Sequence, residues 1–231
     1  ILTKPTMDMK ISQGVTSVVV GNCGISLAPL IANNPPPPLD LIAEEGACRY
    51  STFEEFLLDV EGSPPAVNSA FLVGHSTLRV ATMDSLDRAA SSGEIKKMRS
   101  LLEESLSAGA IGFSTGLFYK PAIMAPTEEV IEIARALHAY KARYVTHMRN
   151  ESDHVIRSLD ETFRIGAESL SPVIVSHHKV QGKNNFGRST ETLAHIDNHL
   201  DGHHHGIAFD VYPYVASSTV LKEDSIKLSE R

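Results

Sequence analysis

The sequence predicts an α/β fold, and more specifically a partial (β/α)8 TIM-like barrel that lacks its first and last strands. Short apolar runs rich in β-branched residues recur along the 231 residues, and stretches with helical spacing separate them. The last three intervals between strand starts are about 29–34 residues, which is the size of a βαβ unit. This alternation is typical of a parallel sheet covered by helices.

The expected strands are continuous apolar runs, as befits parallel strands that are buried on both faces. They lie at residues 15–20, 70–75, 110–116, 144–147, 173–178 and 207–212. Periodicity does not by itself separate a barrel from an open doubly wound sheet. No GxGxxG or Walker-type loop is present, which weakens the nucleotide-binding version of that sheet.

Amphipathic segments between these runs predict the helices. They lie at residues 52–60, 94–108, 127–141, around 156–163, and at 190–200. Thr52 is placed to cap the first helix, and Thr127 precedes two glutamates that favour a helix start.

Composition limits the class of function. The net charge of −7 disfavours nucleic acid and anionic membrane surfaces as partners, and no apolar run is long enough to span a membrane. Two cysteines fit a reducing compartment, so a cytoplasmic location is expected. We divide the chain into a partial catalytic barrel at residues 1–221 and a charged tail at residues 222–231.

Three potential metal ligands stand at the carboxyl ends of separate predicted strands. They are Cys23, His147 and one of the pair His177 and His178. Catalytic residues of such barrels gather at this end, and thiolate and imidazole are the ligands that zinc prefers. Three protein ligands with an open position are typical of a catalytic zinc. The alternative is a small buried cysteine with hydrogen-bonded structural histidines.

For several other polar residues the sequence allows either a functional or a structural role. His75 either faces the site or is structural, and residues 149–151 either orient ligands or form a solvated ion-pair network. Lys179 either holds a substrate carboxylate or is a surface lysine. The run at residues 203–205 is interpreted as a solvated loop, because it precedes a strand. Pocket lining or ordinary loop packing is expected for Tyr119, Tyr212, Tyr214 and Ser218.

Several segments together resemble the N-acyl-D-amino-acid deacylases (D-aminoacylases) of the amidohydrolase superfamily, in the same order along roughly residues 12–220. They are SQGVT at 12–16, VVVGNCG at 18–24, VGHS at 73–76, GFSTGL at 112–117, THMRNE at 146–151, SHHK at 176–179 and DVYPY at 210–214. The GNCG and SHHK elements are far more specific than a lone cysteine or histidine.

The resemblance implies a distorted barrel of the metal-dependent hydrolase type and a small-molecule N-acyl-D-amino acid as substrate. It implies Zn²⁺ held by Cys23, His147 and His177, and a weaker second metal position that shares Cys23. The implied substrate pocket contains Tyr119, Lys179, Tyr212 and Ser218. The implied reaction is hydrolysis of the amide bond to a D-amino acid and a carboxylate.

The sequence departs from the family pattern in two respects. A His-x-His motif is expected before Cys23, and a catalytic Asp on the eighth strand, and neither is found in its place. We therefore assign no catalytic residue, and we expect a fragment with little or no deacylase activity by itself. The alternatives are an inactive metal-binding remnant, or an amidohydrolase that acts on cyclic amides or D-dipeptides; Cys23 argues against the latter, because many such relatives use a carboxylated lysine.

Overall fold

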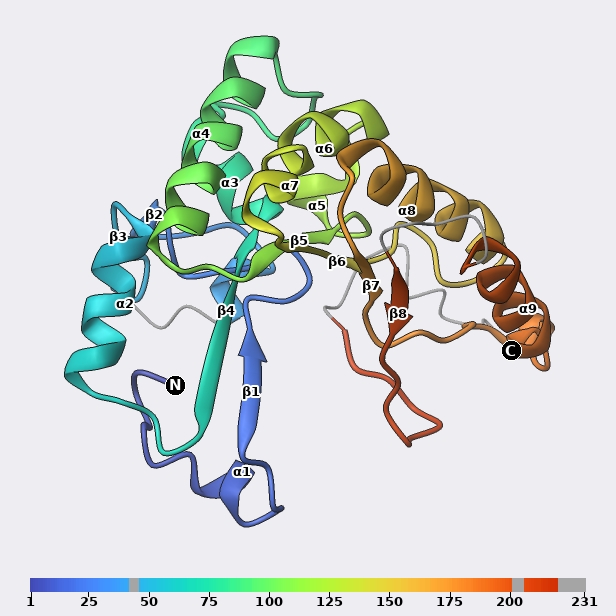
Figure 1. Ribbon diagram of the computed structural model, residues 1–231, viewed down its shortest axis with the longest axis horizontal. Helices are drawn as coiled ribbons and strands as arrows, with labels where there is room; N and C mark the ends of the chain where they lie inside the picture. The colour runs from blue at the N-terminus through green and yellow to red at the C-terminus, as the bar shows by residue number, and fades with distance from the viewer. Residues whose placement is uncertain (42–45, 201–205, 220–231) are drawn as a thin grey trace, which may run out of the picture.

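The computed structural model describes residues 1–41, 46–200 and 206–219, and its centre is one curled sheet of six parallel strands (Figure 1). The strands follow the order β1-β4-β5-β6-β7-β8. Their bounds are Ser17–Val20 (β1), Asn68–Gly74 (β4), Gly112–Gly116 (β5), Arg143–His147 (β6), Val173–Val175 (β7) and Ile207–Phe209 (β8). The six predicted strands and the partial TIM-like barrel are thereby confirmed.

A second, two-stranded antiparallel sheet joins β2 (Leu30–Ile31) to β3 (Arg49–Tyr50). The proline-rich segment at residues 35–38 lies between these two strands and leads into a short 3-10 helix, η1 (Leu39–Leu41). This insertion lies beside the first strands and adds none to the parallel sheet.

Most of the helices lie on the convex side of the sheet, whereas the short first helix lies at the lower end of β1, as Figure 1 shows. Their bounds are Asp8–Ile11 (α1), Phe53–Gly62 (α2), His75–Thr82 (α3), Ser92–Ala108 (α4), Lys120–Ile123 (α5), Thr127–Ala134 (α6), Ala136–Tyr140 (α7), Val155–Ser169 (α8) and Ser189–Leu200 (α9), with a 3-10 turn at Lys183–Asn185 (η2). Two of them begin with capping boxes, Thr52 with Glu55 and Ser91 with Glu94. Each box satisfies backbone N–H groups that the first helical turn leaves without partners.

Besides the short helices α1 and α5, which were not predicted, two helical features differ from the sequence prediction. The predicted helix at 127–141 is divided into α6 and α7 at Arg135. Helix α3 was not predicted, because its polar side chains face inward: His75, Thr77 and Arg79 are all fully buried. A pattern search that assigns polar residues to the solvent face misses such a helix.

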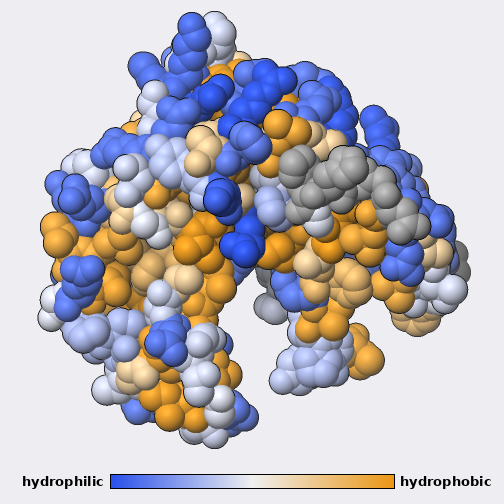
Figure 2. Space-filling view, viewed as in Figure 1, coloured by the Kyte–Doolittle hydropathy of each residue, from blue (hydrophilic) through white to orange (hydrophobic). Residues whose placement is uncertain are grey.

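The core lies between the sheet and the helices and is built from aliphatic and aromatic side chains such as Phe113, Leu102 and Leu159. Figure 2 shows the outer surface: hydrophilic residues prevail over the helices at the top, and hydrophobic residues gather lower, towards the end strands β1 and β8. Val19 of β1 is 51% exposed and Phe209 of β8 is 41% exposed. Both end strands therefore show apolar side chains at the margins of the sheet.

The turn that follows β1 lies unusually close to its neighbours. A Cβ atom added to Gly24 would lie 2.7 Å from the backbone N of Gly116, and one added to Gly116 would lie 2.2 Å from the carbonyl O of Cys23. Gly74 meets the carbonyl of Gly24 in the same way, at 2.4 Å. Ser114 of β5 accepts a hydrogen bond from the N–H of Gly24 and donates one to the carbonyl of Gly21. The backbone of this turn is thus held against the ends of β4 and β5.

A buried ionic cluster joins α3 to α6. Glu129 accepts hydrogen bonds from the Arg79 guanidinium and, at 3.1 Å, from Nε2 of His75. Arg79 also donates to the carbonyl oxygens of Pro121 and Arg88. Burial alone would raise the pKa of Glu129, but the hydrogen bonds from His75 and Arg79 hold that pKa at about 2. The carboxylate therefore stays charged inside the protein and fixes α3 against its neighbours.

Two parts of the sequence analysis lie outside the described residues: the histidine run at 203–205 and the charged tail at 222–231. In the part of the chain that the structure describes, no helix combines the length and apolar character needed to cross a membrane.

The first prediction concerns Gly116→Ala. The new methyl group has no room beside the Cys23 carbonyl, so the turn or β5 must shift. We expect the free energy of unfolding to fall by about 1–3 kcal/mol, as measured by urea denaturation. The matched control is Gly93→Ala in the first turn of α4, where nothing lies within 4 Å of the added atom. Equal unfolding midpoints for the two variants would contradict the close approach.

The second prediction concerns pH and Glu129. Its pKa is lower in the folded chain than the ordinary 4.5, so its stabilising contribution is complete above about pH 4.5 and is lost as the pH falls towards 2. At pH 7, Glu129→Gln should cost about 3–5 kcal/mol, because Arg79 remains buried without a counter-charge. The difference in the free energy of unfolding between wild type and Glu129→Gln should become smaller below pH 4.5, as measured by urea denaturation at each pH.

Glu132→Gln is the control for this comparison, because Glu132 lies on the same helix in an exposed ion pair with Arg135. An exposed pair contributes about 0–1 kcal/mol at most. If the difference in the free energy of unfolding between wild type and Glu129→Gln stays constant from pH 7 to pH 3, the low pKa of Glu129 is refuted.

Candidate metal centre

Three strand ends bring the predicted ligands together. Cys23 lies in the turn after β1, His147 is the last residue of β6, and His177 follows β7. Cys23 and His177 both have left-handed backbone conformations, with φ of 55° and 40°. Such conformations cost energy in residues other than glycine and cluster at functional sites, where surrounding structure enforces them.

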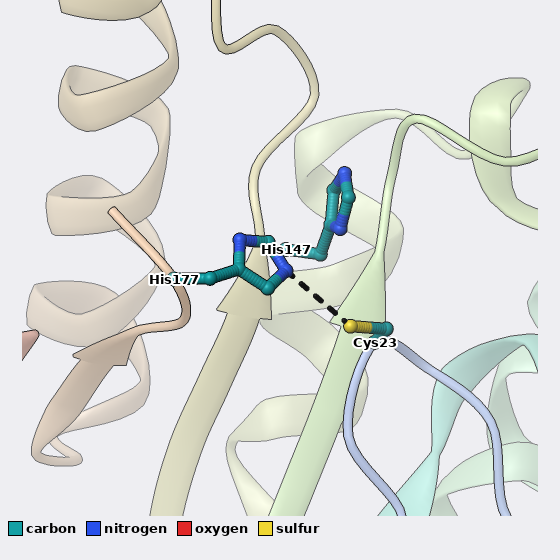
Figure 3. Close-up of side chains that lie close together, drawn as sticks. All are labelled: Cys23, His147 and His177. Carbon is teal, nitrogen blue, oxygen red and sulfur yellow. Dashed lines mark hydrogen bonds between the residues drawn. The ribbon is translucent and has the colours of Figure 1, made fainter. Parts of the chain in front are cut away.

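The three side chains offer ligand atoms that all lie within 4.8 Å of one another. Sγ of Cys23 is 3.5 Å from Nε2 of His177, and the two imidazole rings are 4.6 Å apart at their centroids. Figure 3 shows the three side chains close together on three separate segments, with the ring of His177 directed at Cys23 and the ring of His147 beside them. Cys23 and His177 are partly exposed and His147 is buried, so the cluster stands at the wall of a cavity.

Glu151 is the buried carboxylate behind this cluster. Its Oε1 is 3.1 Å from Nδ1 of His177, and its Oε2 is 3.8 Å from Nε2 of His147 and 2.5 Å from Nζ of Lys179. Burial would raise the pKa of Glu151, but the hydrogen bond to His177 and the positive charges of His147 and Lys179 lower it. One ionised carboxylate therefore faces three cationic or potentially cationic groups.

The same contacts govern His177. Burial lowers its pKa, but hydrogen bonds with Cys23 and Glu151 outweigh burial and raise the pKa to about 9. Nδ1 of His177 lies 3.1 Å from Oε1 of Glu151 and 2.9 Å from Nζ of Lys179, and Nε2 is directed at Cys23. A carboxylate and an ammonium thus both hold the Nδ1 side of the ring, opposite the nitrogen that faces Cys23.

The predicted substrate residues line the same cavity, which has a volume of about 210 Å³. Tyr119 is nearly buried in the loop after β5, and Lys179 lies two residues beyond His177 with its Nζ 5.9 Å from the ring centre of Tyr212. Ser218 is exposed at the rim. Burial raises the pKa of the Tyr119 hydroxyl, so this group is a neutral hydrogen-bonding partner. The roles of these residues in binding stay predictions.

Other histidines have different surroundings. His178 turns away from the cluster, and its Nε2 is 2.9 Å from Oγ1 of Thr192 on α9. His75 is fully buried against Phe113 and Glu129 and does not line the cavity, so the structure favours the structural alternative for it. Of the segment 149–151, Arg149 pairs with Glu161, whereas only Glu151 lies against the cluster.

Two contributors escaped the sequence analysis. The Phe118 ring stacks on His147 at 5.9 Å between centroids, and Ser114 holds the turn of Cys23. Phe118 is adjacent to Tyr119 in the sequence, but nothing in a single sequence marks it as a neighbour of His147. Ser114 lies beside Thr115 inside the fully buried strand GFSTG, and a hydroxyl in such a strand is the one signal available.

The donor set suits a metal ion. A thiolate and two imidazoles are typical ligands of zinc and other borderline ions, whereas Mg²⁺ and Ca²⁺ prefer oxygen ligands. Part of the cavity lies open beside the three side chains, which leaves room for a water molecule or substrate atom. The residues present therefore fit a catalytic rather than a closed structural site.

Comparisons with known proteins now connect this geometry to a family. No family model matches the chain. D-aminoacylase of Alcaligenes xylosoxydans xylosoxydans is 53% identical over 231 residues, which are 100% of this chain and 47% of that protein. N-acyl-D-aspartate deacylase of the same organism is 46% identical over 232 residues, covering 100% and 46% of the two proteins. The chain thus spans about half the length of the curated relatives it matches.

Solved structures agree. A D-aminoacylase structure that addresses the role of its binuclear metal centre has a TM-score of 0.90 at 53% identity, over 93% of this chain and 45% of that one. An N-acyl-D-glutamate deacylase of Bordetella bronchiseptica, complexed with zinc and a phosphonate mimic of the tetrahedral intermediate, has a TM-score of 0.84 at 37% identity, over 92% and 44%. The sequence over its whole length and the fold over most of it agree that this chain is related to the D-aminoacylases, a group of amidohydrolases.

Proposed function

We propose that this chain binds Zn²⁺ through Cys23, His147 and His177 and forms part of an enzyme that hydrolyses N-acyl-D-amino acids to a D-amino acid and a carboxylate. The observation that carries the proposal is the convergence of a thiolate and two imidazoles beside Lys179 in one cavity. The identity to D-aminoacylase over the whole chain supports it.

The choice of zinc rests on the ligands. Relatives have been solved with zinc and with copper chloride, so the comparisons leave the metal open. Mixed thiolate and imidazole ligation without redox chemistry favours zinc for a hydrolase. When bound, such an ion acts as a Lewis acid and lowers the pKa of a coordinated water towards 7.

The chain's own residues bind and orient the substrate. Lys179 is the cation at the cavity wall, and its ammonium contacts Glu151 as well as Nδ1 and the carbonyl oxygen of His177. These contacts engage its three N–H donors, so a substrate carboxylate binds Lys179 by taking the place of one of the His177 contacts while the pair with Glu151 is kept. Glu151 at the same time fixes the ring of His177. A free carboxylate on the substrate therefore has a partner here, which favours an acylated amino acid over a cyclic amide without such a group.

Tyr119 and Tyr212 supply the remaining walls, and Ser218 a hydroxyl at the rim. We assign no general base to the chain. In this proposal the catalytic Asp that the family uses, like its His-x-His motif, belongs to the rest of a longer protein. The cytoplasmic location rests on the scarcity of cysteine alone.

Loss of a ligand tests the metal. Cys23→Ala and His177→Ala should each lower the zinc content of the purified chain by about one equivalent, because three-ligand sites depend on every ligand. Elemental analysis after dialysis measures the content. Cys48→Ala is the matched control, since Cys48 is free and buried in a separate small apolar cluster. Unchanged zinc in Cys23→Ala would remove the ligand assignment.

Enantiomer preference tests the substrate class. The zinc-loaded chain should bind N-acetyl-D-methionine more tightly than its L enantiomer in calorimetry, and Lys179→Met should weaken that binding about ten-fold or more, because a charge-assisted bond from a partly buried ammonium is lost. Because we assign no general base to this chain, its rate of N-acetyl-D-methionine hydrolysis should be at least about 10²-fold below that of complete relatives. Rapid zinc-dependent hydrolysis by the chain alone would overturn the incomplete-site expectation, and equal affinity for both enantiomers would overturn the substrate class.

A further inference from the structure

A second group of potential metal ligands lies on the outer face of the protein, away from the cavity. Among the described residues, Asp160, His195 and His199 offer ligand atoms that all lie within 4.8 Å of one another. Asp160 belongs to α8, whereas both histidines belong to α9. None of the three lines the cavity of Cys23.

The two histidines are four residues apart on one helix, so both rings project from the same face. This spacing is the one that lets a helix present two imidazoles to a single metal ion. The ring centroids of His195 and His199 are 4.5 Å apart, and both rings lie against Phe163 of α8, at 5.9 Å and 4.7 Å. Phe163 is buried and gives the two imidazoles a common wall.

The hydrogen bonds select the ligand atoms. Nδ1 of His199 donates to the backbone carbonyl of His195 at 2.8 Å, so Nε2 is the atom that this ring offers to a metal. Nε2 of His195 lies 2.7 Å from Oδ1 of Asp160. A metal ion in place of the proton between these two atoms requires them to separate to about 3.3 Å, the spacing of two ligands around one tetrahedral ion. Both side chains are partly exposed, which allows this small adjustment.

We propose that Asp160, His195 and His199 form a surface site for a divalent transition-metal ion, which joins α9 to α8. Two imidazoles and one carboxylate suit Zn²⁺, Ni²⁺ or Co²⁺ rather than Mg²⁺ or Ca²⁺. The site has a structural consequence, because α9 buries only Thr192 and Ile196 against the rest of the protein. A metal link adds a second attachment on the outer side of this helix.

The experiment uses Co²⁺, because thiolate ligation gives strong near-ultraviolet charge-transfer bands that a site of imidazole and carboxylate lacks. The untagged full chain with Cys23→Ser removes the thiolate site from the titration. We expect one equivalent of Co²⁺ to bind with visible ligand-field bands alone, and His195→Ala with His199→Ala to weaken this binding about ten-fold or more. Amide exchange in α9 should slow when Co²⁺ is present.

Two further variants make the test decisive. Asp160→Asn, at an exposed position, should weaken Co²⁺ binding without disturbing the helices, as circular dichroism verifies. Replacement of residues 203–205 by alanine controls for the neighbouring histidine run and should leave the affinity within two-fold. The proposal is overturned if Co²⁺ binding is lost when residues 203–205 are replaced but kept in His195→Ala/His199→Ala. It is also overturned if Asp160→Asn leaves the Co²⁺ affinity unchanged.

Discussion

The turn at residues 21–24 presses its backbone against the ends of β4 and β5, and the position of the thiol depends on this contact. Gly24, Gly74 and Gly116 meet where any Cβ atom would collide with a backbone atom. Ser114 then bonds the turn on both sides, from the N–H of Gly24 to the carbonyl of Gly21. The left-handed conformation of Cys23 is therefore imposed by its neighbours. A rigid ligand of this kind keeps its direction without a metal to hold it.

Glu151 holds the other side chains of the cluster in place, as the turn does for Cys23. It contacts His147, His177 and Lys179 from a buried position, so the metal and substrate parts of the cavity share one counter-charge. An isolated carboxylate would be costly there, and the three neighbours are what keep it ionised. Substitution of Lys179 thus alters more than a substrate contact, because it removes one of the charges that stabilise Glu151. The same coupling makes the ring of His177 sensitive to the state of Lys179.

Local rules were sufficient for the strands and for the place of the cluster, whereas the choice of His177 over His178 came from the family resemblance. β-branched runs fix the strands, and parallel strands place Cys23, His147 and His177 at one end. Helix α3 escaped because Arg79 and His75 are satisfied internally by Glu129, a residue 50 positions away from Arg79. The division between α6 and α7 at Arg135 was also missed, because no glycine or proline marks it in the sequence. The support from Ser114 is a long-range contact with residues about 90 positions away, and local pattern has no access to it.

The short distance between Cys23 and His177 also shows that the sheet is strongly curved. In the strand order, β4, β5 and β6 separate β1 from β7, which makes four inter-strand steps. At about 4.8 Å per step, a flat sheet would hold the ends of β1 and β7 about 19 Å apart. Sγ of Cys23 is nevertheless 3.5 Å from Nε2 of His177, and side chains of this size cannot span the difference alone. The cluster therefore exists because the sheet closes toward a barrel, and a metal ion bound to both ends would in turn oppose flattening of the sheet (Figures 1 and 3).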